Sequence, residues 1–148
     1  MIRNATYEDL TDIAVVGWEM HQESRFSKYE YNVEKVINLA SRLIDSDRGI
    51  VLLYEVDGEI AGGFMGEVME QYFGPSLAAY DYALFVKSTH RGGTTAMRLV
   101  KEFVKQAKQK GAEEVVIANA TGVDIQMVEK LYTKLKFDRV GGVYVYEG

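Results

Sequence analysis

Apolar residues recur along this chain with two different periods, and the period of each run predicts the element that it forms. Spacings of three and four residues indicate helices that bury one face. They occur over about Tyr7 to Met20, Val33 to Ile44, Thr94 to Lys110 and Ile125 to Leu135. Runs of apolar and β-branched residues predict strands at Met1 to Asn4, Gly49 to Val56, Glu59 to about Tyr72, Ala78 to Val86, Val115 to Ala118 and Gly142 to Tyr146.

The predicted elements follow one another in the order β-α-α-β-β-β-α-β-α-β. Thr6 and Asp9 have the spacing of a capping box ahead of the first helix. Asp57-Gly58 separates two strands and is a strong hairpin signal. This order predicts an α/β (α+β) fold with a mainly antiparallel central sheet and about four flanking helices. Composition is even along the chain, so we expect one domain over residues 1–148.

Composition and charge exclude several classes of function. The chain has no cysteine and only two histidines, so we expect no disulfide framework, no cysteine nucleophile and no metal site. The net charge of −5 argues against nucleic-acid binding, which needs a basic surface. No apolar run approaches ~18 residues and the first residues lack a signal-peptide core, so we expect no membrane segment and a cytoplasmic protein.

The most informative segment runs from Val86 to Ala96, where a strand ends, a turn follows and a helix begins at once. Unpaired backbone N–H groups and the helix dipole favour an anion at such a helix N-terminus. Gly92 and Gly93 permit a tight turn, and Arg91 adds a guanidinium. The glycine patterns of P-loops and dinucleotide-binding folds are both absent. An ordinary strand-to-helix turn is the alternative interpretation.

The same segment resembles the acetyl-CoA turn of the GNAT superfamily of N-acetyltransferases, whose pattern is R/Q-x-x-G-x-G/A after a strand that ends in valine. Arg91 and Ala96 match its first and last positions, whereas Thr94 replaces the middle glycine and Ser88 stands where proline is common. Residues 1–10, the hairpin 56–62, Asn119 and the run 131–137 are similar to further parts of the family, with Lys136 in place of a glycine. The Arg-Gly-Gly turn also resembles a variant found among phage-encoded members.

The resemblance implies a GNAT-like fold and an N-acetyltransferase that moves an acetyl group directly from acetyl-CoA, with no metal, to a primary amine of a small molecule or protein. It implies that Tyr132 is the general acid that protonates the CoA sulfur; a buried core tyrosine is the alternative. The residues that it implies for cofactor binding are Leu84, Phe85 and Val86, the turn residues Arg91, Gly92, Gly93, Thr94, Thr95 and Ala96, and Asn119. For Asn119 the resemblance implies either a CoA contact or a helix-positioning contact, and a turn-forming asparagine is the alternative.

The general base stays open at this point. Many family members have a glutamate where this chain has Tyr80, which is a poor base at neutral pH. Asp81 points to the opposite face of its strand. Glu67 and Glu70 on the preceding strand are candidates, and a chain of water molecules is an equal alternative.

We expect the acceptor wall to combine aromatic side chains with carboxylates, which suit a cationic amine. The aromatic candidates are Trp18, Phe26, Tyr29, Tyr31, Tyr72 and Phe73, and the carboxylates are Glu23, Glu67 and Glu70. Two other functions remain open: a noncatalytic acyl-CoA-binding or regulatory module on the same fold, and a phosphate-binding protein without CoA specificity. Because family members often dimerise, the resemblance leaves a homodimer as an option.

Overall fold

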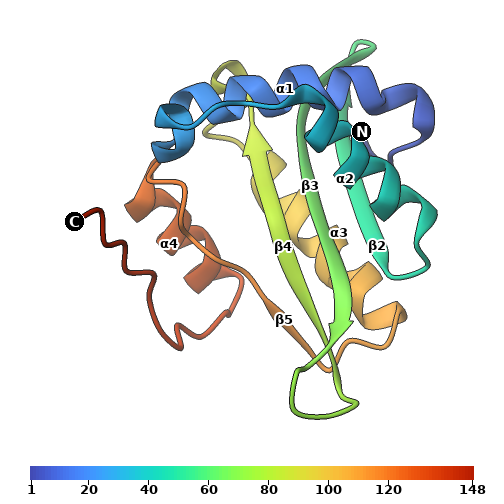
Figure 1. The fold of residues 1–148 in the computed structure, drawn as a ribbon, viewed down its shortest axis with the longest axis vertical. Helices are drawn as coiled ribbons and strands as arrows, with labels where there is room; N and C mark the ends of the chain where they lie inside the picture. Colours follow the sequence, from blue (N-terminus) through green and yellow to red (C-terminus); the bar gives the residue numbers. More distant parts are fainter.

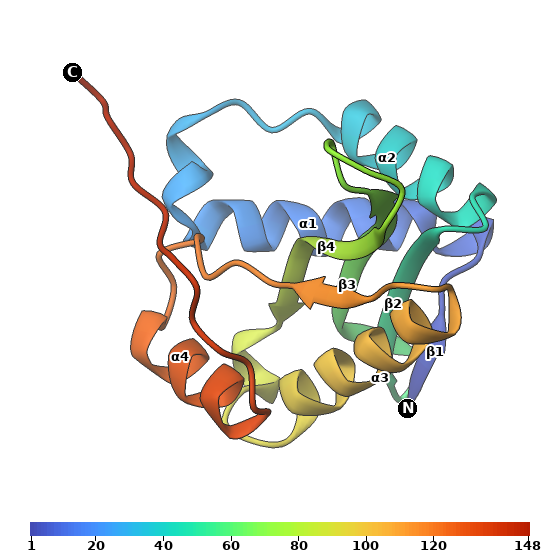
Figure 2. The ribbon, with the colours of Figure 1, turned by 90° about the horizontal axis from the view of Figure 1, so that it is seen from below.

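A β-sheet lies between two layers of helices (Figure 1). The computed structural model describes all residues, 1–148. Its strands are β1 (Ile2–Asn4), β2 (Gly49–Val56), β3 (Glu59–Glu70), β4 (Leu77–Val86) and β5 (Glu114–Val116). Its helices are α1 (Leu10–Glu23), α2 (Val33–Asp45), α3 (Thr95–Gln109) and α4 (Ile125–Lys134), with short 3₁₀ turns at Tyr7–Asp9, Arg25–Lys28 and Ser88–His90. Figure 2 shows α1 and α2 on one side of the sheet and α3 and α4 on the other. The predicted fold class is confirmed.

The five strands lie in sequence order, and every neighbouring pair is antiparallel except the parallel pair β4 and β5. β5 pairs with β4 only from Ala78 to Tyr80. Beyond that point the outer edge of β4, from Asp81 to Val86, has no strand partner, while its inner edge stays paired with β3. The two strands therefore separate toward the end of β4, where the glycine turn follows.

Alternation along β2 divides the apolar core between the two faces of the sheet, as the strand pattern predicts. Ile50 and Leu52 pack with Phe64 of β3 and with α3. The Phe64 and Phe103 rings are stacked with their centroids 4.1 Å apart. The opposite face holds Val51 and Leu53 together with buried residues of α1, α2 and β3: Ile13, Ala40, Leu43 and Ile60. Both layers of helix are thus fixed to one rigid sheet.

The first helix begins with the predicted capping box. The Asp9 carboxylate accepts the backbone N–H of Thr6 at 2.8 Å, and the residues Tyr7–Asp9 form a 3₁₀ turn before α1. α1 then extends to Glu23. It therefore includes His21, which the sequence pattern placed in a connecting segment.

The predicted C-terminal strand from Gly142 to Tyr146 is wrong, because residues 137–148 contain no helix or strand. Residues 138–148 make no backbone hydrogen bond. Tyr144 and Tyr146 are more than nine-tenths exposed. Alternating valine and tyrosine give a segment the capacity to form a strand, but a strand also needs an edge to pair with. The predicted strand Val115 to Ala118 likewise ends early, at Val116.

Candidate active site

The glycine turn after β4 forms an open loop. Gly92 has a φ of +89°, which favours glycine. A Cβ added at Gly92 or Gly93 would meet no protein atom within 4 Å. The backbone is thus open to close approach by a ligand. Thr95 begins α3 and is buried, whereas Thr94 is exposed.

Arg91 is held in place from three directions. Its Nε donates to the carbonyl of Val86 at 2.7 Å, and its guanidinium lies 5.5 Å from the centre of the Phe85 ring. Its terminal nitrogen donates to the carboxylate of Glu23 at the end of α1. No local pattern indicates this ion pair, because the two residues lie 68 positions apart in the chain.

A cleft of about 390 Å³ connects this loop with the end of β4 and with α4. Among the predicted cofactor-binding residues, those that line it are Leu84, Phe85, Val86, Arg91, Gly92, Gly93, Thr95 and Ala96. α4 contributes Val128 and Leu131, which are not among the cofactor-binding residues predicted from the sequence. The structure thus brings most of the predicted cofactor residues to one cleft, although Thr94 and Asn119 do not line it.

Asn119 instead positions the last helix. Its side-chain amide donates to the carbonyl of Ile125, the first residue of α4, at 3.0 Å. Because α4 carries Tyr132, this contact helps to set where that tyrosine lies. It corresponds to the helix-positioning alternative for Asn119.

Tyr132 packs against the apolar core from α4 and, like Thr94 and Asn119, does not line the cleft. Its hydroxyl oxygen is 3.5 Å from the carbonyl oxygen of Ala118, the outer limit of a hydrogen bond. The N–H of Ala118 donates to the Asp81 carboxylate at 3.2 Å. Burial raises the pKa of Tyr132, and the nearby Asp81 charge raises it further. Burial also raises the pKa of Asp81 itself. The hydroxyl therefore keeps its proton at neutral and moderately alkaline pH.

The two candidate bases on β3 lie in different surroundings. Both oxygens of Glu67 accept from the Arg42 guanidinium at 3.1 Å, and the Tyr82 hydroxyl donates to the same carboxylate. These hydrogen bonds hold the pKa of Glu67 below its usual value, so it is a weak base. Glu70 is exposed and pairs with Leu77, nine residues before Val86 along β4. At about 3.3 Å per residue, it lies roughly 30 Å from the glycine turn.

A second cavity, of about 380 Å³, lies between α1, α2 and the sheet. Phe26 and Tyr31 line it, as the expected acceptor wall requires. Trp18 and Tyr29 do not line it and are at least half exposed. Tyr72 and Phe73 are exposed in the turn between β3 and β4 and do not line it either. The only carboxylate in its lining is Glu30, and none of the three predicted ones lines it.

No helix is both long enough and apolar enough to cross a membrane. No group of three or more histidine, aspartate and glutamate side chains is arranged to hold a metal ion.

The sheet separates between its fourth and fifth strands, and a glycine turn followed by a helix stands at the end of the fourth. The model of the acetyltransferase (GNAT) family matches residues 4–137. The chain belongs to this family, as the resemblance of the Arg91 turn implied. Among proteins with curated descriptions, no sequence matches the chain.

Solved structures of acetyltransferases have the same fold. A ribosomal-protein-alanine N-acetyltransferase from Brucella melitensis biovar Abortus 2308 is 20% identical, with a TM-score of 0.73 over 100% of this chain and 98% of the other. The aminoglycoside N-acetyltransferase AAC(6')-Iy, in complex with CoA, is 15% identical, with a TM-score of 0.80 over 100% and 93%. An aminoglycoside acetyltransferase from an uncultured soil metagenomic sample, in complex with sisomicin, is 19% identical, with a TM-score of 0.73 over 99% and 94%. At these identities the likeness shows the fold.

Proposed function

We propose that this protein is an acetyl-CoA-dependent N-acetyltransferase that moves an acetyl group directly to a primary amine of a small molecule or protein. The observation that carries the proposal is the cleft at the end of β4, where the open glycine turn, Arg91 and the unpaired strand edge meet. The CoA in the solved structure of AAC(6')-Iy supports the choice of cofactor.

In this proposal the turn holds the pyrophosphate. The N–H groups at the start of α3 and the Arg91 guanidinium supply donors and positive charge. Gly92 and Gly93 leave room for phosphate oxygens against the backbone. The pantetheine arm then runs along the outer edge of β4, whose N–H and C=O groups are free of strand pairing. An N–H of that edge polarises the thioester carbonyl.

The acetyl transfer itself makes one bond and breaks another. The neutral amine attacks the thioester carbon, a C–N bond forms, and the C–S bond breaks as the thiolate leaves. In this proposal Tyr132 gives the thiolate its proton; its hydroxyl is protonated at neutral pH and lies 3.5 Å from the Ala118 carbonyl oxygen, two residues beyond β5. The amine proton goes to water, because Glu67 is held by Arg42 and Glu70 lies at the far end of β3.

Two measurements on the purified protein test the proposal. Acetyl-CoA at ~100 times its Kd should stabilise the fold by about 2.7 kcal/mol, seen as a raised melting temperature. ATP at the same concentration is the control for general phosphate binding. Release of free CoA thiol in the presence of amines measures turnover. No melting shift at millimolar acetyl-CoA contradicts the proposal, and binding without turnover indicates the noncatalytic module.

A further inference from the structure

We propose that the acetyl acceptor is a small primary amine with an apolar alkyl or aryl body, bound in the cavity between α1, α2 and the sheet with its nitrogen at His21. This inference rests on the proposed acetyl transfer and names its substrate class. It differs from the polycationic sugars named with two of the structural neighbours.

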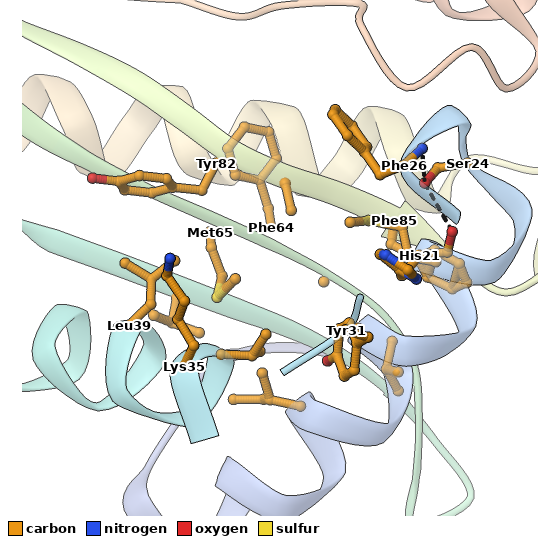
Figure 3. A pocket seen from close by; sticks show the side chains of 18 of the residues that line it. His21, Ser24, Phe26, Tyr31, Lys35, Leu39, Phe64, Met65, Tyr82 and Phe85 are labelled. Carbon is orange, nitrogen blue, oxygen red and sulfur yellow. Dashed lines mark hydrogen bonds between the residues drawn. The ribbon is translucent and has the colours of Figure 1, made fainter. Parts of the chain in front are cut away.

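The lining of this cavity is mostly apolar. Of its 23 lining residues 15 are hydrophobic, and Figure 3 shows Leu39, Phe64, Met65 and Phe85 around it. Its volume of about 380 Å³ lies in the range of pockets that enclose a small ligand. Transfer of an apolar group from water into this apolar cavity is favourable, and this hydrophobic effect supplies the binding free energy.

The charges at the cavity argue against an acceptor with several ammonium groups. Glu30 and Lys35 are the only lining residues that carry a full charge, and they have opposite signs. Glu67, near the same face, is already paired with Arg42. A polycation would place ammonium groups in this cavity without carboxylate partners, which is unfavourable. A single amine on an apolar body avoids that cost.

His21 provides the polar contact that such an amine needs. Its Nε2 is the one buried side-chain polar atom in the protein without a hydrogen-bond partner. Buried polar atoms are nearly always paired, so this nitrogen requires an explanation. A neutral primary amine can donate to an imidazole nitrogen or accept from its N–H, so it fits either tautomer. Because Nε2 is covered by protein atoms in the free protein, the imidazole turns toward the cavity as the amine binds.

The position of His21 is fixed by its neighbours. Ser24 Oγ donates to the His21 carbonyl at 3.0 Å and accepts the N–H of Phe26, which ties down the end of α1 (Figure 3). The imidazole and Tyr31 rings lie 5.2 Å apart. Tyr31 in turn donates to the Ala14 carbonyl at 2.7 Å. The His21 backbone is thus fixed, and its imidazole packs beside the Tyr31 ring at the cavity wall.

The cavity also adjoins the proposed cofactor cleft. Met20 and Phe85 line both. Phe85 belongs to the strand whose outer edge is proposed to hold the thioester. An amine beside His21 therefore lies next to the place where the acetyl group arrives.

A panel of amines tests the substrate class. Thiol release from acetyl-CoA is measured with 2-phenylethylamine and hexylamine, with the polycations spermidine and sisomicin, and with a peptide that begins with alanine. We expect a kcat/KM at least ~100-fold higher for the two apolar amines, because each ammonium group left unpaired costs several-fold to a hundredfold in binding. Equal or better turnover of a polycation or of the peptide overturns the proposal.

Calorimetry on the same sample separates this proposal from the proposed function. Binding of 2-phenylethylamine to the free protein supports the cavity assignment even if acetyl-CoA does not bind, in which case the proposed function fails. Binding of acetyl-CoA without binding or acetylation of either apolar amine overturns the substrate class and leaves the cofactor assignment intact.

Two variants locate the site. Val36→Phe fills part of the cavity from α2, and His21→Phe keeps the ring volume but removes Nε2. Each should raise the KM for 2-phenylethylamine about tenfold and leave the KM for acetyl-CoA unchanged. Val33→Phe is the matched control, since Val33 is half exposed on the same helix and does not line the cavity. Melting curves report folding of each variant. An unchanged amine KM in either folded cavity variant overturns the proposed site.

Discussion

Arg3 and Asp9 join the first strand to the start of the first helix through two parallel hydrogen bonds of 2.8 Å. The Arg3 guanidinium lowers the pKa of Asp9 from 3.8 to about 2, aided by the Thr6 N–H. Because the folded pKa lies below the unfolded one, this carboxylate stabilises the fold above about pH 4. The stabilisation is lost as pH falls toward 2.

Asp9→Asn should therefore lower the free energy of unfolding by about 2 kcal/mol at pH 7. Thermal unfolding at pH 7 and at pH 2.5 checks this, and the difference from the parent should shrink at the lower pH. Asp12→Asn is the control, because Asp12 is exposed on the same helix. A difference that stays constant with pH contradicts the assigned role of the ion pair.

Tyr132→Phe separates the acid role from the core-residue alternative. If the hydroxyl protonates the thiolate, kcat and kcat/KM should fall together by about a hundredfold, with little change in KM. Because burial raises the pKa of Tyr132, the parent should show no alkaline loss of kcat from this residue up to about pH 10. Steady-state kinetics over a pH series measure both effects.

The control for that substitution is Tyr144→Phe, since Tyr144 is 93% exposed outside every element. A Tyr132→Phe variant within about threefold of the parent in kcat would return Tyr132 to a packing role. Its ring would then contribute to stability through packing, for example against the Phe137 ring, whose centroid lies 5.7 Å from that of Tyr132.

At the scale of elements, the turn between β4 and α3 carries a prediction about cofactor affinity. Gly93→Val should weaken acetyl-CoA binding at least tenfold, because a branched side chain would stand where phosphate must approach the backbone. The melting temperature of the free protein should barely change, since a Cβ there meets no protein atom. Gly74→Val, also in open space, should leave affinity unchanged. Calorimetric titration measures the Kd, and equal values for both variants would place the pyrophosphate elsewhere.

The period of apolar residues predicted a helix or strand correctly where the folded chain gives that segment a surface to pack on or a strand to pair with. The helix at Val33–Asp45 and the strands on either side of Asp57-Gly58 formed within a few residues of their predicted bounds. The exception is the run from Gly142 to Tyr146, whose pattern describes a strand that finds no edge. Pairing is a long-range property, so the local pattern could not decide it.

The candidate site likewise has one part that the sequence predicts and another that only the folded structure shows. The turn from Arg91 to Ala96 is contiguous in sequence and could be recognised there. The contacts of Arg91 with Glu23 and of Glu67 with Arg42 join distant segments and appear only in the fold. No sequence pattern identifies His21 as a candidate site residue either, because the sequence does not show that its Nε2 lacks a hydrogen-bond partner.

Over the whole molecule, contacts are concentrated in the three central strands. β2, β3 and β4 pair along most of their lengths, and β2 and β3 hold four of the largest fully buried side chains: Ile50, Leu52, Phe64 and Val68. Hydrogen exchange should therefore be slowest at their amides and fastest over residues 138–148, which lack backbone hydrogen bonds. Mass-spectrometric exchange measures this order. Strong protection of residues 138–148 would show that their backbone amides form hydrogen bonds in solution.

The ion pair between Glu23 and Arg91 changes what an arriving cofactor meets. The guanidinium already has an anion beside it, so a pyrophosphate must take the place of a carboxylate. Binding is then an exchange of partners, and its electrostatic gain is the difference between two attractions. Added salt weakens both attractions alike, which makes affinity less sensitive to ionic strength than a bare arginine would allow. The exchange also removes one of the contacts that hold the last turn of α1, where Met20 and His21 line the neighbouring cavity. Binding in the proposed cofactor cleft would thus alter the wall of the proposed acceptor cavity.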